Sequence, residues 1–160
     1  MAIVKNPKEL CYREYIGKFR VLCLDYGDER IGIALSDLNW IIASPIKVLK
    51  SHGVYPGIFQ LIAEHSVGII VVGAPKSLSG GSFGKQFIKV GKFTEKLDEL
   101  ISEKNIDVCI VYWDERLSTV AANRFLSESE LSPLKKKKSI DKVAASFILQ
   151  GFLDYMNFNS

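Results

Sequence analysis

The chain has 160 residues, of which 48% are hydrophobic and 24% are charged, and its net charge is +3. These values are typical of one globular domain with a substantial core. No apolar run approaches the roughly 20 residues that cross a bilayer. The first residues carry scattered charges where a secretory signal would have an apolar segment. We therefore expect a cytoplasmic protein with no membrane span.

The three cysteines, Cys11, Cys23 and Cys109, are far apart in the sequence. An odd number of isolated cysteines fits neither a disulfide framework nor a zinc site. The two histidines, His52 and His65, lie in or beside a predicted helix, away from the acidic residues considered below. The sequence therefore gives little support to zinc chemistry or to a serine–histidine site.

The first half of the chain predicts three strands and then a helix. An apolar run over Phe19–Leu24 predicts the first strand, and isoleucine and leucine alternate at period two in the second, residues 30–37. A third strand is expected within Trp40–Leu49. Pro45 interrupts it and cannot donate a ladder hydrogen bond, so we place this strand at an edge of the sheet. Over residues 58–65, Ile58, Leu61, Ile62 and His65 recur with helical spacing, which predicts a helix.

The pattern then changes to strands that are apolar throughout. Residues 69–73 and Ile106–Trp113 are continuous apolar runs, which predicts parallel strands covered on both faces. A loop rich in glycine and serine, Pro75–Gly84, follows the first of them. Apolar residues at intervals of three and four over 87–101 predict a long amphipathic helix between the two strands.

The C-terminal part predicts a short helix near Ser118–Ser127, a lysine-rich loop and a last helix. The last helix should bury one stripe, formed by Ile140, Val143, Ala144, Phe147, Ile148, Phe152 and Tyr155. The element order predicts an α/β fold, with a mixed β-sheet of three antiparallel strands plus parallel strands, flanked by α-helices. We assign residues 1–18 to an N-terminal extension without a role, and residues 19–160 to a single domain.

Acidic residues stand at the ends of the predicted elements. Asp25 ends the first strand, and Asp114 and Glu115 end the last one. Asp141 is expected in the first turn of the last helix, at its second position, with Ser139 as the cap. Ligands of open α/β sheets bind beyond the carboxyl ends of the strands, so these carboxylates should share one crevice. Neighbouring central strands would bring Asp25 and Glu115 within reach of one cation.

Such a set suits Mg²⁺ or Mn²⁺, which prefer oxygen ligands and act together with substrate phosphate. Each residue also has a simpler interpretation when taken alone. Asp25 resembles a turn residue, Asp114 and Glu115 could form a surface ion pair, and Asp141 is favoured by the helix dipole. A metal site is favoured because all of these carboxylates should fall near one another in a mixed sheet.

The basic residues are concentrated in one run of four, Lys135, Lys136, Lys137 and Lys138. On a nearly neutral protein, this local patch is compatible with a polyanionic ligand such as nucleic acid. A solvated surface loop is the alternative. Arg116, next to the proposed metal ligand, is a second candidate for a phosphate contact.

Four segments carry a family resemblance: LDYGDERIGIALSD, IIVVGAP, WDERLST and DKVAASFILQGFLD. In order and spacing they resemble the YqgF (RuvX) family of RuvC-like proteins with the RNase H fold, over about Arg20–Asp154. The resemblance implies that Asp25, Glu115 and Asp141 are catalytic and bind the metal, with Asp114 as the alternative to Glu115. The loop after the second apolar strand begins Ala74-Pro75-Lys76-Ser77, where the family usually has Leu-Pro-Leu-Asn. This departure concerns the substrate side of the site.

The family is described both as nucleases that mature the 5′ end of pre-16S rRNA and as Holliday junction resolvases. We therefore expect a hydrolase of phosphodiester bonds in ribosome biogenesis, acting on pre-rRNA rather than branched DNA. The alternatives are a junction resolvase in DNA recombination and repair, and a non-catalytic nucleic-acid-binding module. Junction cleavage would need two sites and hence a homodimer, whereas RNA processing is compatible with a monomer. The first segment also resembles the first phosphate loop of actin-like ATPases and sugar kinases, but those enzymes clasp nucleotide between two such domains, in a chain at least twice this long.

Overall fold

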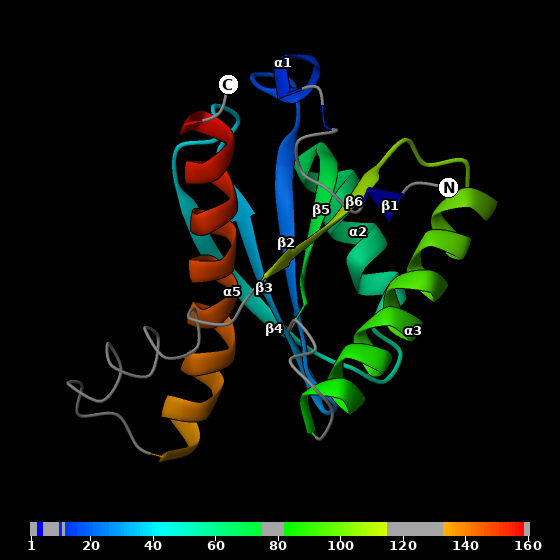
Figure 1. Cartoon of the computed structure of the whole chain (residues 1–160), viewed down its shortest axis with the longest axis vertical. Helices are drawn as coiled ribbons and strands as arrows, with labels where there is room; N and C mark the ends of the chain where they lie inside the picture. The colour runs from blue at the N-terminus through cyan, green and yellow to red at the C-terminus, as the bar shows by residue number, and fades with distance from the viewer. Residues whose placement is uncertain (1–2, 5–9, 11, 75–81, 115–132, 159–160) are drawn as a thin grey trace.

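The computed structural model describes residues 3–4, 10, 12–74, 82–114 and 133–158. The described residues form three layers, with a central sheet between helices (Figure 1). Helices α2 (Tyr55–His65) and α3 (Ser82–Glu103) cover one face of the sheet. Helix α5 (Pro133–Phe158) covers the other face. The α/β architecture predicted from the sequence is confirmed.

The six strands of the sheet lie in the order β1-β6-β5-β2-β3-β4. Strand β2 pairs antiparallel with β3, and β3 pairs antiparallel with β4, whereas β5 is parallel to β2 and to β6. The mixed sheet is therefore as predicted, and the strand containing Pro45 lies at an edge. The bounds of the strands are β1 Ile3–Val4, β2 Arg20–Tyr26, β3 Arg30–Ser36, β4 Ala43–Lys50, β5 Val67–Ala74 and β6 Cys109–Asp114.

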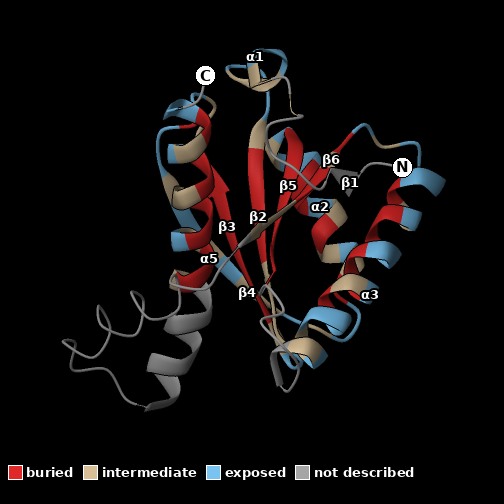
Figure 2. Ribbon diagram, viewed as in Figure 1, coloured by how far each residue is buried: buried red, intermediate tan, exposed pale blue. Residues whose placement is uncertain are grey.

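The two faces of the sheet bury separate cores because successive side chains of a strand point to opposite faces. On β2, Leu22 and Leu24 pack in the core under α2 and α3, whereas Val21 and Cys23 pack in the core under α5. Burial is concentrated on the strands and on the sheet-facing sides of the helices (Figure 2). Strands β2 and β5 are covered on both sides, which explains their continuous apolar sequences.

Helix α5 begins earlier than the sequence predicted. It starts at Pro133, so Lys135–Lys138 lie within its first turns and not in a loop. Asp141 is consequently an interior residue of the helix, and Ser139 is not its cap. The physical reason is that lysine is a good helix former, and proline is well tolerated at the first helical position. The four consecutive lysines therefore did not reveal where the helix begins.

The buried stripe of α5 also differs from the predicted one. Ala144, Ile148 and Phe152 are buried as expected, but the Phe147 side chain is 37% exposed. Among the described side chains of the helix, those of Ala145, Leu149, Leu153 and Met156 are also buried. Apolar residues occupy more than one side of this helix, so spacing alone could not tell which side meets the sheet.

The N-terminal residues, which the sequence left without a role, take part in the fold. Strand β1 pairs in parallel with β6 and extends the sheet by one strand. Helix α1 (Tyr12–Tyr15) places the Tyr12 ring edge-on to Trp40, with ring centroids 5.2 Å apart. The Tyr12 hydroxyl donates a hydrogen bond to the Asn157 side chain on α5. These contacts join the N-terminal segment to the C-terminal helix.

The two described cysteines, Cys23 and Cys109, are not joined in a disulfide. Burial raises the pKa of the Cys109 thiol, and the charge of Asp107 raises it further. Cys109 is therefore protonated near neutral pH and is a poor metal ligand in that form. The predicted short helix near Ser118–Ser127 lies outside the described residues. Across the described part of the chain, no helix is long and apolar enough to cross a membrane.

Candidate functional site

Asp25 occupies the carboxyl end of the central strand β2. Its backbone pairs with Gly32 of β3, while the preceding residue, Leu24, pairs with Val72 of β5. Because side chains alternate along the strand, Asp25 shares the face of Val21 and Cys23, which is the face that α5 covers. The side chain of Asp25 is only partly buried. The structure thus places this carboxylate where a central strand gives way to a turn.

Asp114 occupies the carboxyl end of β6, at the same end of the sheet. Its backbone pairs with Ala74 of β5, one residue beyond the level of Asp25. Strand β5 lies between β2 and β6, so the expectation that these two strands are neighbours is wrong. Two inter-strand steps separate the two backbones by about 10 Å. The carboxyl ends of β2 and β6 therefore lie on either side of the end of β5. Tyr112, two residues before Asp114, packs in the core under α2 and α3, so alternation along β6 does not put position 114 on the face of Asp25.

Asp141 lies on α5, which runs antiparallel to β2 (Figure 1). A hydrogen bond from the Ala43 amide to the Gln150 side chain fixes the position of the helix along the sheet. Ala43 pairs with Ser36, whose hydroxyl accepts a hydrogen bond from the Val21 amide. Gln150 therefore lies level with the start of β2. Asp141 precedes Gln150 by nine residues, or about 13 Å of helix. The four residues from Val21 to Asp25 span about the same distance along β2. The backbone of Asp141 is therefore level with that of Asp25.

The structure thus brings three of the four predicted carboxylate positions, Asp25, Asp114 and Asp141, to one end of the sheet. Glu115 and Arg116 lie outside the described residues. Of the side chains that the structure describes, no three from histidine, cysteine, aspartate or glutamate gather as a metal site. The donor types at this end are nonetheless those that Mg²⁺ and Mn²⁺ prefer. A carboxylate-bound divalent cation fits the residues present.

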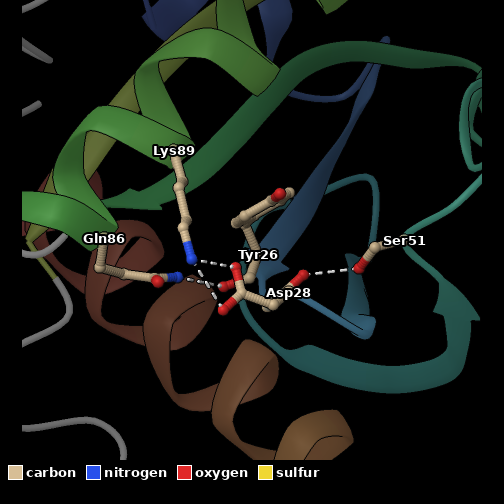
Figure 3. Close-up of polar contacts among 6 residues, drawn as sticks. Tyr26, Asp28, Ser51, Gln86 and Lys89 are labelled. Atoms are coloured by element: carbon tan, nitrogen blue, oxygen red, sulfur yellow. Dashed lines mark hydrogen bonds and ion pairs between the residues drawn. The ribbon is translucent and has the colours of Figure 1, made fainter.

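The turn that follows Asp25 is held in place by helix α3 (Figure 3). The Lys89 ammonium contacts both carboxylate oxygens of Asp28, at 3.0 and 3.1 Å. The Gln86 amide donates a hydrogen bond to the Tyr26 carbonyl at 3.3 Å. The Tyr26 ring also packs on Phe93 of the same helix, with ring centroids 4.9 Å apart. Residues on both sides of Gly27 are therefore tied to α3.

The end of β4 holds the other side of this turn. The Ser51 hydroxyl donates to the Gly27 carbonyl, and the Ser51 amide donates to the Glu29 carbonyl. Gly27 is required for steric reasons, because a Cβ atom there would lie 2.6 Å from the carbonyl oxygen of Arg30. The turn is thus packed too closely to admit a side chain. Its rigidity fixes the end of β2 and therefore the backbone of Asp25.

We expect Gly27→Ala to destabilise the protein by about 1–3 kcal/mol, the usual cost of forcing extra atoms into a packed site. The matched control is Gly91→Ala in α3, where a Cβ atom meets nothing within 4 Å. Alanine in a helix interior is favoured over glycine, so the control should gain up to about 1 kcal/mol. Urea unfolding of both variants measures the two effects. Equal changes of the same sign would contradict the assigned role of Gly27.

Sequence reasoning missed the contribution of α3 to this end of the molecule. It predicted the apolar side of the helix, and Val90, Phe93, Leu97 and Ile101 are buried as their spacing implies. Phe87, at the start of the predicted stripe, is 47% exposed, so the buried side begins later than predicted. It did not consider the polar side, where Gln86 and Lys89 reach the turn after Asp25. The available signal was the spacing of the lysines, which recur at intervals of four and three along the same helix.

Comparison with known proteins identifies the family. The model of the RuvX family, described as "Holliday junction resolvase", matches residues 19–155. A protein of Desulforamulus reducens named "Putative pre-16S rRNA nuclease" is 45% identical over 139 residues, covering 84% of this chain and 96% of that protein. A protein of Clostridioides difficile with the same name is 46% identical, covering 85% and 94%.

Solved structures of low sequence identity share the fold. T. thermophilus RuvC, in complex with a Holliday junction substrate, superposes with a TM-score of 0.52 at 12% identity, over 86% of this chain and 96% of RuvC. A yeast mitochondrial Holliday junction resolvase gives a TM-score of 0.54 at 13% identity, over 95% and 86%. Without β1, the strand order here is the 3-2-1-4-5 order of the RuvC-like fold. From the family match and the relatives at 45–46% identity, the chain belongs to the RuvX family.

Proposed function

We propose that this protein is a divalent-metal-dependent nuclease that processes the 5′ end of pre-16S rRNA. The observation that carries the proposal is the placement of Asp25 and Asp141, from a strand and from the helix that covers its face, at the end of the sheet where β6 also ends. The names of the RuvX relatives support the choice of substrate. The proposal places the protein in the cytoplasm, where ribosome precursors are processed.

Asp25, Glu115 and Asp141 would hold Mg²⁺ or Mn²⁺, with Asp114 as the alternative to Glu115. The bound ion would supply a water nucleophile of lowered pKa and would offset charge on the phosphodiester. The role of Asp25 depends on the turn beyond it, which Lys89, Gln86 and Ser51 contact. These contacts limit movement of the carboxylate when substrate binds, as preorganisation requires.

The lysines of α5 belong to the same helix as Asp141. Lys135–Lys138 precede Asp141 by three to six residues, which is about 5–9 Å along the helix axis. A phosphate backbone attracted to these lysines would therefore lie near the carboxylates. This placement supports a role for Lys135–Lys138, and for Arg116 beside Glu115, in holding the substrate. The attraction is electrostatic and independent of sequence.

A four-way DNA junction is the alternative substrate, and the description of the RuvX family model favours it. Symmetric junction cleavage requires two active sites in a dimer. RNA processing requires one site and one strand. We favour RNA because the 45–46% identical relatives are named for pre-16S rRNA.

The test supplies the purified protein, with Mg²⁺ or Mn²⁺, with two labelled substrates at equal concentration. One is 16S rRNA carrying its 5′ leader, and the other is a four-way DNA junction. We expect shortening of the RNA at its 5′ end and an intact junction. Paired symmetric nicks in the junction with intact RNA would overturn the choice of substrate. Intact RNA and intact DNA, with metal bound, would indicate a non-catalytic binding module.

A further inference from the structure

Helix α3 carries a stripe of lysines on its exposed side. Lys85, Lys89, Lys92 and Lys96 recur at intervals of four, three and four residues, which places them on one side of a helix. All four side chains are exposed. Residues 82–94 contain three of these lysines and no acidic residue, whereas residues 95–103 contain four acidic residues and one lysine. The positive charge is therefore concentrated in the first half of the helix.

Helix stability does not explain this distribution. The helix dipole favours acidic residues in the first turn and basic residues in the last. Helix α3 has no acidic residue in its first turn and no basic residue in its last. Lys85 lies in the first turn and Glu103 ends the helix, which is the reverse of the favourable order. The lysines are placed against the dipole.

Ion pairing accounts for only part of the stripe. Lys89 pairs with Asp28, and Lys96 lies 3.7 Å from Glu99. Lys85 and Lys92 have no ion-pair partner among the residues that the structure describes. Their charges are directed at solvent, on either side of the one lysine that reaches the turn after Asp25. No contact with the described residues explains the charge of either lysine.

The stripe starts beside the candidate site. Lys89 and Gln86 contact the turn that follows Asp25, so this part of α3 adjoins the carboxyl end of β2 (Figure 3). Helix α5 adjoins the same end from the opposite face of the sheet, with Lys135–Lys138 in its first turns (Figure 1). Lys85 and Lys92 are about 10 Å apart along the helix axis. Two lysines at this separation can contact different phosphates of the same strand.

We infer that the first half of α3 binds the phosphate backbone of the RNA strand as it leaves the carboxylate site, through Lys85 and Lys92. The inference rests on the proposed function for the identity of the strand. Helix α5 lies on one face of the sheet and the α3 stripe on the other, so the strand would pass across the end of the sheet. The contacts are to phosphate, so they fix the path of the strand and do not select its sequence.

The test measures binding without cleavage. A fluorescein-labelled single-stranded RNA oligonucleotide is titrated in EDTA, and the Kd from fluorescence anisotropy is followed over a series of KCl concentrations. The variant is Lys85→Gln/Lys92→Gln, which leaves the Lys89–Asp28 pair in place. Loss of two contacts should flatten the slope of log K against log salt by about 1.4, at about 0.7 per contact. Exposed positions of this kind change stability by less than about 0.5 kcal/mol, so the fold should be unaffected.

The matched control is Lys18→Gln/Lys104→Gln. It removes the same charge from exposed positions at the opposite end of the sheet, before β2 and after α3. Its slope should equal that of the wild type. An unchanged slope for Lys85→Gln/Lys92→Gln, or an equal flattening for the control, would overturn the inference. Because EDTA prevents metal-dependent cleavage, either result can be obtained whether or not the protein is a nuclease.

Discussion

Asp25→Asn is expected to lower metal-dependent cleavage of the RNA substrate by about 10²-fold or more, with the fold intact. Asparagine keeps the shape of aspartate and the pairing of β2 with β3, but it removes a negative ligand. Several kcal/mol of transition-state stabilisation depend on a properly held metal ion, which corresponds to a loss of this size. The rate at saturating Mn²⁺, with thermal unfolding measured in parallel, gives both quantities.

The matched control for this loss is Asp107→Asn, an exposed aspartate that precedes β6 at the far end of the strand from Asp114. It should cleave at the wild-type rate. Asp141→Asn should behave like Asp25→Asn, and comparison of Asp114→Asn with Glu115→Gln identifies which of the two is the ligand. Wild-type cleavage by a well-folded Asp25→Asn variant would refute the assignment of this carboxylate.

Phe152→Ala should have the largest effect on stability, with a loss of about 3–5 kcal/mol in the free energy of unfolding. The Phe152 side chain is fully buried on α5, between Trp40 and Trp113, with ring centroids 6.0 and 5.7 Å away. Its removal leaves a cavity between the helix and the sheet. Since domains of this size are stable by about 5–15 kcal/mol, the variant should unfold at a much lower urea concentration.

Phe158→Ala on the same helix is the matched control, because the Phe158 side chain is 89% exposed. Its unfolding midpoint should stay within about 0.5 kcal/mol of the wild type. A comparable loss in both variants would show that the contacts of Phe152 with the two tryptophans do not stabilise α5 on the sheet. The effect of Phe152 extends to the site, because the same helix positions Asp141.

Most of the fold could be predicted from the sequence because strand burial leaves a direct pattern. Continuous apolar runs in β5 and β6, and Pro45 in an edge strand, each have one simple structural explanation. Apolar residues at every second position identified β3 as a strand, although the structure buries both of its faces. Helix α5 was harder for two physical reasons. Lysines do not interrupt a helix, so its start at Pro133 could not be recognised from the sequence. Apolar residues lie on several sides of the helix, so the spacing could not show which side is buried.

The sequence could predict which end of the sheet carries the candidate site, because that depends only on where the strands end. Asp25 and Asp114 lie at one end of the sheet because parallel strands share a direction, which sequence reasoning could use. The interposed strand β5 depends on strand order, which no local pattern of β2 or β6 encodes. The contacts of Lys89 and Gln86 join residues about sixty positions apart in the sequence, so a single sequence gave no means of pairing them.

The most direct test of the central claim is calorimetric titration of Mn²⁺ into the wild-type protein and into Asp25→Asn. A carboxylate site at the end of β2 predicts saturable binding by the wild type and binding weakened by about 10–100-fold in the variant, the loss typical of disturbing a metal site. The Asp107→Asn control should bind like the wild type. Equal affinities for Mn²⁺ in the wild type and in Asp25→Asn would contradict the claim that this end of the sheet holds the catalytic metal.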